Sequence, residues 1–355
     1  MRVLLIKMSS MGDILHTLPA LTDARAEHPD IRFDWIVEAG FAEIPTWHPA
    51  VERVFPIRLR QWRRQLWSPA VWRQMRQFFA QVAAAGPYDL ILDAQGLLKS
   101  AFVAKKAQKA LYKQGVNDGE KNGLKKNWGP PPIWGMDHKT AREGLAARFY
   151  DHPVHVPVAQ HAITRLRQLF AAALDYSVPP GALDYGVCLP EGAVNVPVSA
   201  PYWVFLHGTT WETKLWPQAH WRELIRRAAG QGVQVVLPWG SEAEYARSRA
   251  LAQGFAHAVV PPERLSLSEM AQLLRHSQQV VAVDTGLAHL AAALAVPTLV
   301  LYRVTDPQRV GALGPKVKHL CSPLARQYIK RFTQPAQEQA SLQGLEVDTV
   351  WRIIS

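Results

Sequence analysis

The segment from Val280 to Tyr302 reads as a buried strand, a turn, a short helix and a second strand. Its first residues, 280–283, form an unbroken apolar run, as expected of a strand covered on both faces. Asp-Thr-Gly at 284–286 interrupts this run with capping and turn residues, and Pro297 ends the Ala-rich helix that follows. Such a unit is typical of a parallel α/β sheet, and it restricts the possible fold classes more than any other feature of the sequence.

The helix that begins after this strand offers a site for an anion. Its first backbone N–H groups have no partner within the helix, and its dipole places positive charge there, which suits a phosphate. The residues that would face the anion lie between Asp284 and His289. The alternative is an ordinary strand-to-helix turn in which Asp284 only caps the helix.

The same alternation of strands and helices continues through both halves of the chain. We expect strands at 2–7, 31–37, 51–57 and 88–93 in the first half, and at 202–206, 233–238, 256–260 and 280–283 in the second. Strands separated by helical segments predict parallel, doubly wound sheets. Loops at the carboxyl ends of such strands bind ligands. Two such domains would face each other across a central cleft, which is a usual place for a ligand.

The length of 355 residues favours two domains over one core. We predict an N-terminal Rossmann-like domain at 1–178, a linker at 179–201 that is bracketed by Pro-rich stretches, and a C-terminal Rossmann-like domain at 202–330. Residues 331–355 are expected to be helical and to pack back on the N-terminal domain. The basic, Gly- and Pro-rich stretch at 105–134 is expected to be a surface loop, with or without a direct role.

The formal net charge of +11 implies an anionic partner: nucleic acid, an acidic membrane face or a phosphorylated substrate. Nucleic acid is disfavoured, because the sequence has no RNP, zinc-finger or helix-turn-helix signature. The first residues turn polar too quickly for a secretory signal, and no apolar run reaches membrane-spanning length. Two cysteines, Cys188 and Cys321, indicate no disulfide framework and fit a reducing cytosol.

Two further groups of polar residues follow predicted strands. In Ser-Ser-Met-Gly-Asp at 9–13, Asp13 lies at or just before a helix start, where a carboxylate is ionised and can serve as a general base. Its alternative role is a plain helix cap. After the strand at 202–206, Thr209, Thr210 and Lys214 offer hydroxyls and a point charge that suit a diphosphate. The alternative for Lys214 is a solvated surface lysine.

Several blocks of the sequence resemble the lipopolysaccharide heptosyltransferases of glycosyltransferase family 9 in order and character. These blocks are residues 1–21, Phe-Asp-Trp-Ile-Val-Glu at 33–38, Asp-Ala-Gln-Gly-Leu-Leu-Lys-Ser at 93–100, Thr-Ala-Arg-Glu at 140–143, Lys-Leu-Trp-Pro at 214–217 and Val-Asp-Thr-Gly-Leu-Ala-His at 283–289. The resemblance extends from Met1 to about Pro315. Ser-Ser-Met-Gly-Asp at 9–13 is its most specific part, whereas Asp-Thr-Gly-Leu is shared more widely in the family.

The resemblance implies a GT-B glycosyltransferase that inverts the anomeric configuration of the sugar it transfers and needs neither a metal nor a cofactor. Its expected donor is ADP-L-glycero-β-D-manno-heptose, and its expected acceptor is the first Kdo of Kdo2-lipid A. It would work in the cytoplasm, peripherally on the anionic cytoplasmic face of the inner membrane. The alternatives are a related heptosyltransferase with a later core acceptor and a non-catalytic protein that binds a sugar nucleotide or a polyanion.

The resemblance also implies roles for single residues. Asp13 would be the base that deprotonates the acceptor, and Lys214 would neutralise the departing diphosphate. The donor-binding residues would be Thr209, Thr210, Lys214, Asp284, Thr285, Gly286, Leu287 and His289. The acceptor-binding residues would be Ser10, Gly12, Arg60, Arg63, Arg64 and Arg142. The chain departs from the family at 105–134, which is longer than usual, at His138, where Trp is common, and at Arg303-Val304, which replaces Gly-Pro.

Overall fold

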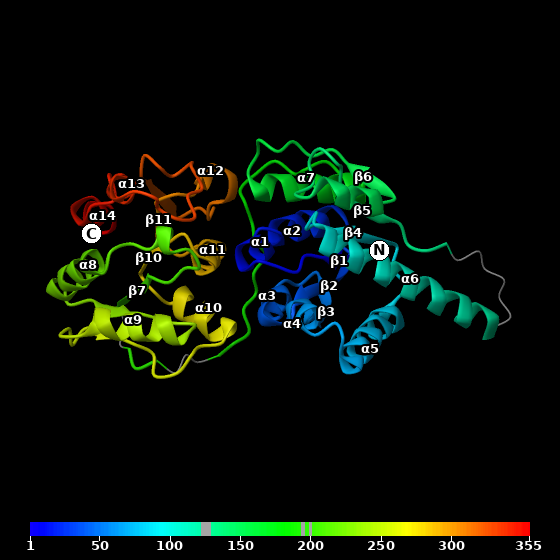
Figure 1. Ribbon diagram of the computed structural model, residues 1–355, viewed down its shortest axis with the longest axis horizontal. Helices are drawn as coiled ribbons and strands as arrows, with labels where there is room; N and C mark the ends of the chain where they lie inside the picture. Colours follow the sequence, from blue (N-terminus) through cyan, green and yellow to red (C-terminus); the bar gives the residue numbers. More distant parts are fainter. Residues whose placement is uncertain (122–128, 193–195, 199–200) are drawn as a thin grey trace. The chain divides into compact units, whose positions relative to one another are not determined.

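The computed structural model describes residues 1–121, 129–192, 196–198 and 201–355. The chain forms two compact units, Met1–Cys188 and Leu189–Ser355, and each unit has its own six-stranded parallel sheet (Figure 1). This confirms the predicted α/β class with two doubly wound sheets. The predicted linker at 179–201 includes residues 193–195 and 199–200, which lie outside the described part.

The sheet of the first unit has the strand order β3-β2-β1-β4-β5-β6. These strands are β1 (Arg2–Ile6), β2 (Arg32–Glu38), β3 (Val51–Ile57), β4 (Leu90–Asp93), β5 (Ile133–Met136) and β6 (His152–Val154). The central strands β1 and β4 are apolar and buried almost throughout, because helices cover both of their faces. The order reverses between β1 and β4, so this unit has its topological switch point there.

Successive side chains of β1 face opposite helical layers. Leu4 and Ile6 pack into the core beneath α5 and α6, while Phe33 of β2 meets Phe170 of α7 on the other side at 5.9 Å between ring centres. The helices of this unit are α1 (Met11–Leu15), α2 (Leu18–Glu27), α3 (Glu43–Thr46), α4 (Leu59–Arg64), α5 (Pro69–Ala85), α6 (Leu98–Lys121) and α7 (Ala162–Leu174), with 3-10 turns η1 (Ala39–Phe41) and η2 (Gly144–Phe149). The sequence analysis assigned no helix to α5.

The second unit repeats the topology of the first. Its strands are β7 (Tyr202–Leu206), β8 (Gln234–Val236), β9 (Ala258–Val259), β10 (Gln279–Val283), β11 (Thr298–Tyr302) and β12 (Val317–Cys321), in the order β12-β11-β10-β7-β8-β9. The switch point therefore lies between β7 and β10. The helical segments are η3 (Glu212–Lys214), α8 (Gln218–Gly230), α9 (Glu242–Ala252), α10 (Leu267–Arg275), α11 (Gly286–Ala293), α12 (Pro307–Val310), α13 (Pro335–Ala340) and α14 (Val347–Ile354).

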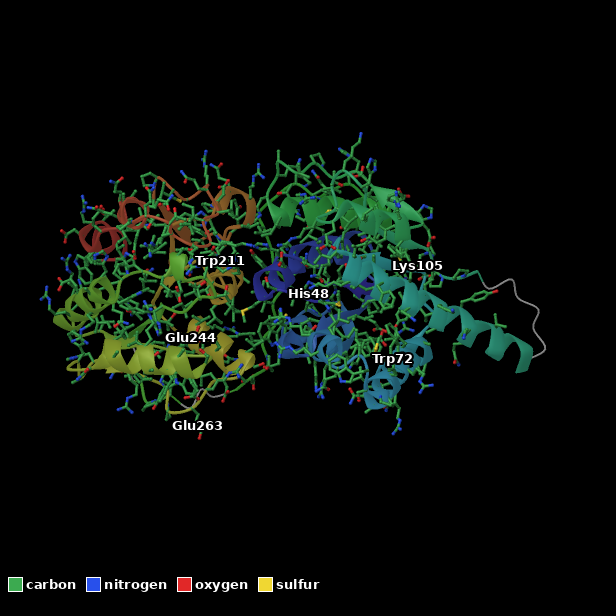
Figure 2. The ribbon with its side chains drawn as sticks, viewed as in Figure 1. His48, Trp72, Lys105, Trp211, Glu244 and Glu263 are labelled. Atoms are coloured by element: carbon green, nitrogen blue, oxygen red, sulfur yellow. The ribbon has the colours of Figure 1, made fainter. Side chains whose placement is uncertain are left out.

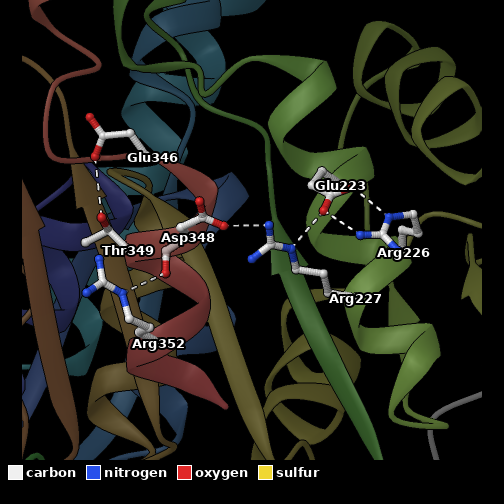
Figure 3. A network of polar contacts seen from close by, with 7 residues as sticks. All are labelled: Glu223, Arg226, Arg227, Glu346, Asp348, Thr349 and Arg352. Carbon is white, nitrogen blue, oxygen red and sulfur yellow. Dashed lines mark hydrogen bonds and ion pairs between the residues drawn. The ribbon is translucent and has the colours of Figure 1, made fainter.

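The C-terminal segment carries the helices α13 and α14, and it packs on its own unit. Leu345 and Val350 belong to the core of the second unit, beneath α8. An exposed ion pair joins α8 to α14, with Arg227 Nη2 2.6 Å from Asp348 Oδ1 (Figure 3). The apolar face of α14 thus finds a partner within the second unit, and packing of this segment on the N-terminal domain stays a prediction.

Most of the stretch expected to be a basic loop is helix. α6 continues to Lys121, residues 122–128 lie outside the described part, and 133–136 form β5. Ala104, Ala107 and Leu111 extend the buried stripe of α6, and the lysines between them are good helix formers that face solvent. The lysines thus mark the outer face of a helix and not a loop. No helix in the described residues is long and apolar enough to cross a membrane.

Candidate active site

Four charged residues lie at the two switch points. In the first unit, Asp13 follows β1 and Asp93 ends β4, and these two strands are hydrogen-bonded neighbours. In the second unit, Lys214 follows β7 and Asp284 follows β10, which are also neighbours. Ligands bind in open α/β sheets where the strand order reverses, at the carboxyl ends of the strands. The topology therefore gives each unit one candidate site.

Asp13 lies in the first turn of α1, one turn after Ser10. Its Oδ2 accepts hydrogen bonds from the Ser10 backbone N–H at 2.9 Å and from Ser10 Oγ at 3.0 Å. Gly12 is buried in the same turn. Within the described part of the chain, Oδ1 of Asp13 accepts no hydrogen bond. Asp13 thus caps the turn with one oxygen and keeps the other available, so the capping role and the base role are compatible.

The surroundings of Asp13 favour its ionised form. Burial alone would raise the pKa of this carboxyl, but the Lys7 ammonium, both Ser10 donors and Arg142 outweigh it and hold the pKa below its usual range. Lys7 is itself buried, and its Nζ donates to the Ala94 carbonyl at 3.0 Å. Burial lowers the pKa of Lys7, against the pull of Asp13 and Asp93. The sequence analysis did not select Lys7, although it ends the first predicted strand.

We expect Ser10→Ala to move the acidic limb of the kcat/KM–pH profile to higher pH. The Ser10 hydroxyl stabilises the Asp13 carboxylate, so its removal raises the pKa and the base becomes protonated at a higher pH. Ser241→Ala, which removes the hydroxyl that caps α9, is the matched control and should leave the limb in place. A limb that stays in place in Ser10→Ala would assign it to a group other than Asp13.

A buried network holds the loop that carries Asp13. Gln95 accepts from the Met8 backbone N–H at 2.8 Å and donates to the Ser9 carbonyl at 2.9 Å. Asp93 orients Gln95 by accepting from its backbone N–H at 2.9 Å. Tyr150 donates to Asp93 Oδ2 at 2.8 Å. Its ring packs directly against Gly135 of β5, where any side chain would overlap it. Asp93 is fully buried with these partners, so it is a positioning residue.

Three arginines lie close to Lys99, and one of them, Arg142, also lies close to Asp13. Burial lowers the pKa of Lys99, and repulsion from Arg60, Arg63 and Arg142 lowers it further. The Glu38 carboxylate opposes this shift. Arg142 also acts on Asp13. The structure thus brings together three of the four predicted acceptor arginines and adds Lys99, which the sequence analysis missed. Arg64 is exposed at the end of α4, and within the described residues no ion pair or hydrogen bond joins its side chain to this group.

In the second unit, Lys214 forms an ion pair with Asp284. Lys214 Nζ lies 2.7 Å from Asp284 Oδ2, and both side chains are largely buried. Thr305 Oγ1 donates to the same carboxylate oxygen at 2.6 Å, and Thr209 Oγ1 donates to the Asp284 backbone carbonyl at 2.9 Å. The ammonium also lies 4.5 Å from the ring centre of Trp211, which is labelled in Figure 2. A solvated lysine is therefore excluded.

The anion site predicted from the sequence would lie at the first turn of α11. Thr285 is the N-cap and its side chain makes no capping hydrogen bond, so the helix start keeps backbone donors that no side chain caps. Gly286 and Leu287 are partly exposed there, while His289 is buried on the same helix. Thr210 is exposed after β7. Asp284 precedes the helix and binds Lys214, so the alternative in which it only caps α11 is wrong.

Arg303, where the family commonly has glycine, fastens the loop that carries Lys214. Its buried guanidinium donates to the carbonyl of Leu215, the residue after Lys214. It also donates to Ser341 Oγ at 2.6 Å and 3.1 Å and lies over the ring of Phe332. This residue therefore ties three separate segments of the second unit together. The sequence analysis noted the departure without assigning it a role.

Metal ligands are a separate question. Among the described residues, no group of three or more His, Cys, Asp and Glu side chains is placed to hold a metal ion. The expectation that the reaction needs no metal stays a prediction, which a chelator tests directly.

Two Rossmann-like doubly wound units with these site residues define a glycosyltransferase of the GT-B class. A family model, Glycosyltransferase family 9 (heptosyltransferase), matches residues 123–340. Lipopolysaccharide heptosyltransferase 1 of Pseudomonas aeruginosa is 49% identical over 352 residues, which are 98% of this chain and 92% of the relative. The enzyme of the same name from Escherichia coli K12 is 44% identical, over 96% of this chain and 99% of the relative. The chain belongs to the heptosyltransferases of glycosyltransferase family 9.

Solved structures give the same result. An E. coli heptosyltransferase, WaaC, with ADP is 40% identical and has a TM-score of 0.83, covering 100% of this chain and 99% of that one. The same enzyme with ADP-2-deoxy-2-fluoro heptose has a TM-score of 0.80 at the same identity and coverage. The family predicted from the sequence motifs is confirmed.

Proposed function

We propose that this enzyme transfers L-glycero-D-manno-heptose from ADP-L-glycero-β-D-manno-heptose to the first Kdo of Kdo2-lipid A, in lipopolysaccharide inner-core biosynthesis. The observation that carries the proposal is the buried Lys214–Asp284 pair at the start of α11, a built site for a diphosphate. The relatives named lipopolysaccharide heptosyltransferase 1 and the structures with ADP and an ADP-heptose analogue support the choice of substrates.

Asp13 is proposed as the general base. Its free Oδ1 takes the proton of the acceptor hydroxyl, and the resulting oxygen attacks the anomeric carbon of the heptose. The bond between that carbon and the diphosphate oxygen breaks as the new glycosidic bond forms, and its electron pair leaves with ADP. Attack from the face opposite the leaving group inverts the anomeric configuration. Because Asp13 is held ionised, it is ready to accept a proton at neutral pH.

Lys214 is proposed to stabilise the departing diphosphate. Asp284 and the ring of Trp211 hold its ammonium in place before the donor arrives, so little reorganisation is needed as charge develops. The start of α11, with Thr285, Gly286 and Leu287, adds backbone donors to the same charge. Thr209, Thr210 and His289 complete the proposed donor site. A cation and a helix terminus together can do the work of a metal ion, so we propose a metal-independent reaction.

The acceptor is proposed to bind in the first unit. Arg60, Arg63 and Arg142, together with Lys99, form a cluster of like charges that suits the carboxylates and phosphates of Kdo2-lipid A, and Arg142 links this cluster to Asp13. Ser10, Gly12 and Arg64 complete the proposed acceptor site. An acceptor anchored in a bilayer places the enzyme peripherally on the cytoplasmic face of the inner membrane.

The deciding experiment is mass spectrometry of Kdo2-lipid A after incubation with the enzyme and ADP-heptose in EDTA. We expect the mass of one heptose to be added. If donor binds but no product forms, a later core acceptor replaces Kdo2-lipid A in the proposal. A product that appears only when a divalent metal is restored would contradict metal independence. A chain that does not bind ADP-heptose at all would be a polyanion-binding protein or another non-catalytic relative.

A further inference from the structure

Three apolar side chains stand in solvent where α4 turns into α5. Trp67 is 82% exposed, Trp72 is 48% exposed and Leu66 is 45% exposed. The Trp72 indole N–H donates to the Leu66 carbonyl at 2.6 Å, so the turn is structured. Single exposed apolar residues are ordinary, but two indole rings and a leucine on one turn form a patch that calls for a partner.

Other apolar residues of α4 and α5 anchor these helices in the core. Trp62 on α4 and Val71, Met75 and Phe78 on α5 point inward and pack in the core of the first unit. Trp62 donates its own indole N–H to Gln74 at 3.0 Å, which fastens α4 to α5. The two helices are therefore anchored by one set of apolar residues and present a second set to the outside.

The segment that bears this patch carries charge of one sign. From position 58 to position 88 the sequence has six arginines and no acidic residue. All six are exposed, and among the described residues none of them forms an ion pair with an acid: Arg58, Arg60, Arg63, Arg64, Arg73 and Arg76. Unbalanced arginines beside exposed indole rings fit a surface that is anionic outside and apolar beneath.

The neighbouring helix α6 repeats this combination. It packs along α5, and its outer face carries Phe102 and Tyr112, each 46% exposed. The Lys106 ammonium lies 5.3 Å from the ring centre of Phe102, and Lys109 and Lys113 continue the basic face. Aromatic rings mixed with lysine and arginine thus extend from one helix to the next.

We propose that the α4–α5 turn is the surface by which the enzyme docks on an anionic phospholipid bilayer. The ring of Trp67, with Leu66 and Trp72, enters the headgroup region, where indoles are favoured because they are apolar with one polar N–H. Arg73 and Arg76 bind lipid phosphates from above it. The inference deepens the proposed function, because it names the part of the chain that meets the membrane in which the acceptor is held.

Flotation with vesicles tests this docking without any acceptor present. We expect the wild-type enzyme to float with vesicles of phosphatidylethanolamine and phosphatidylglycerol, and not with vesicles of phosphatidylcholine alone. Trp67→Ser should lower the partition coefficient at least about tenfold, because a large apolar area no longer inserts. Arg73→Gln and Arg76→Gln should each lower it about fivefold at low salt. Two substitutions outside the patch are the controls. Val158→Ser changes a half-exposed apolar residue, and Arg32→Gln removes an exposed arginine.

Two heptose-transfer assays complete the design. With a deacylated, water-soluble acceptor, Trp67→Ser should match the wild type, and with acceptor embedded in vesicles it should be slower. Trp67→Ser protein that floats like the wild type overturns the docking surface, as does equal binding to phosphatidylcholine. A self-associating wild type that becomes monomeric in Trp67→Ser would replace the bilayer with a second copy. Flotation requires no turnover, so a failure of docking and a failure of the proposed reaction are seen separately.

Discussion

Asp13→Asn should lower kcat by at least about 10²-fold, which is the contribution expected of a general base. The amide oxygen of asparagine can still accept from Ser10, so the turn that starts α1 keeps its shape. What the variant loses is basicity at the oxygen that faces the acceptor. Steady-state kinetics with Kdo2-lipid A and ADP-heptose measures the effect.

The control for this variant is donor binding. Because the proposed donor residues lie in the second unit, calorimetric titration with ADP-heptose should give the wild-type dissociation constant. The melting temperature should also stay close to that of the wild type. Turnover near the wild-type level would remove Asp13 from the role of base, and a lost donor affinity would show that it acts in binding and not in chemistry.

Lys214→Met should lower kcat/KM by about 10²–10³-fold, the usual cost of removing one group that stabilises developing negative charge. It should also destabilise the second unit, since the largely buried Asp284 carboxylate loses its cation. Breaking such a pair costs about 3–5 kcal/mol, and the remaining bond from Thr305 favours the lower end. Kinetics and urea denaturation measure the two effects.

A second substitution separates catalysis from folding. Asp284→Asn added to Lys214→Met removes the unpaired charge, so the free energy of unfolding should recover while kcat/KM stays low. Lys330→Met is the matched single control, because its exposed ammonium lies 5.4 Å from the same Trp211 ring and has no proposed role. Recovery of activity in the double variant would mean that Lys214 serves only to neutralise Asp284.

The elements around the switch points could be read from sequence because they depend on local signals. Val280–Val283 is apolar enough to be a doubly covered strand, and the Asp-Thr-Gly that follows can only turn and start a helix. The observed strand, Gln279–Val283, begins one residue before the predicted run at 280–283, and the helix that follows spans Gly286–Ala293. The placement of Lys214 and Asp284 at carboxyl ends of strands followed from the alternation of strands and helices, whereas their ion pair is seen only in the structure.

The features that sequence did not reveal depend on contacts between distant segments. Lys99 joins the arginine cluster only because α6 begins beside α4, and Lys7 matters only because burial places its charge near Asp13. The helix α6 was mistaken for a loop because its lysines were read as a charge run, although the alanines between them bury a regular stripe. Local sequence patterns predict the helices and strands, whereas tertiary packing decides which face of each is buried and which residues it brings together.

The contacts of Arg303 make the C-terminus part of the donor half of the enzyme. A truncation before Pro335 would remove none of the predicted site residues. It would nevertheless take away the Ser341 hydroxyl that holds Arg303 and the Leu345 carbonyl that accepts from the Trp216 indole at 2.9 Å. Both bonds secure the loop that follows Lys214. The last twenty residues are therefore an unsuitable place for deletion or fusion, and sequence variation there should be constrained together with position 303.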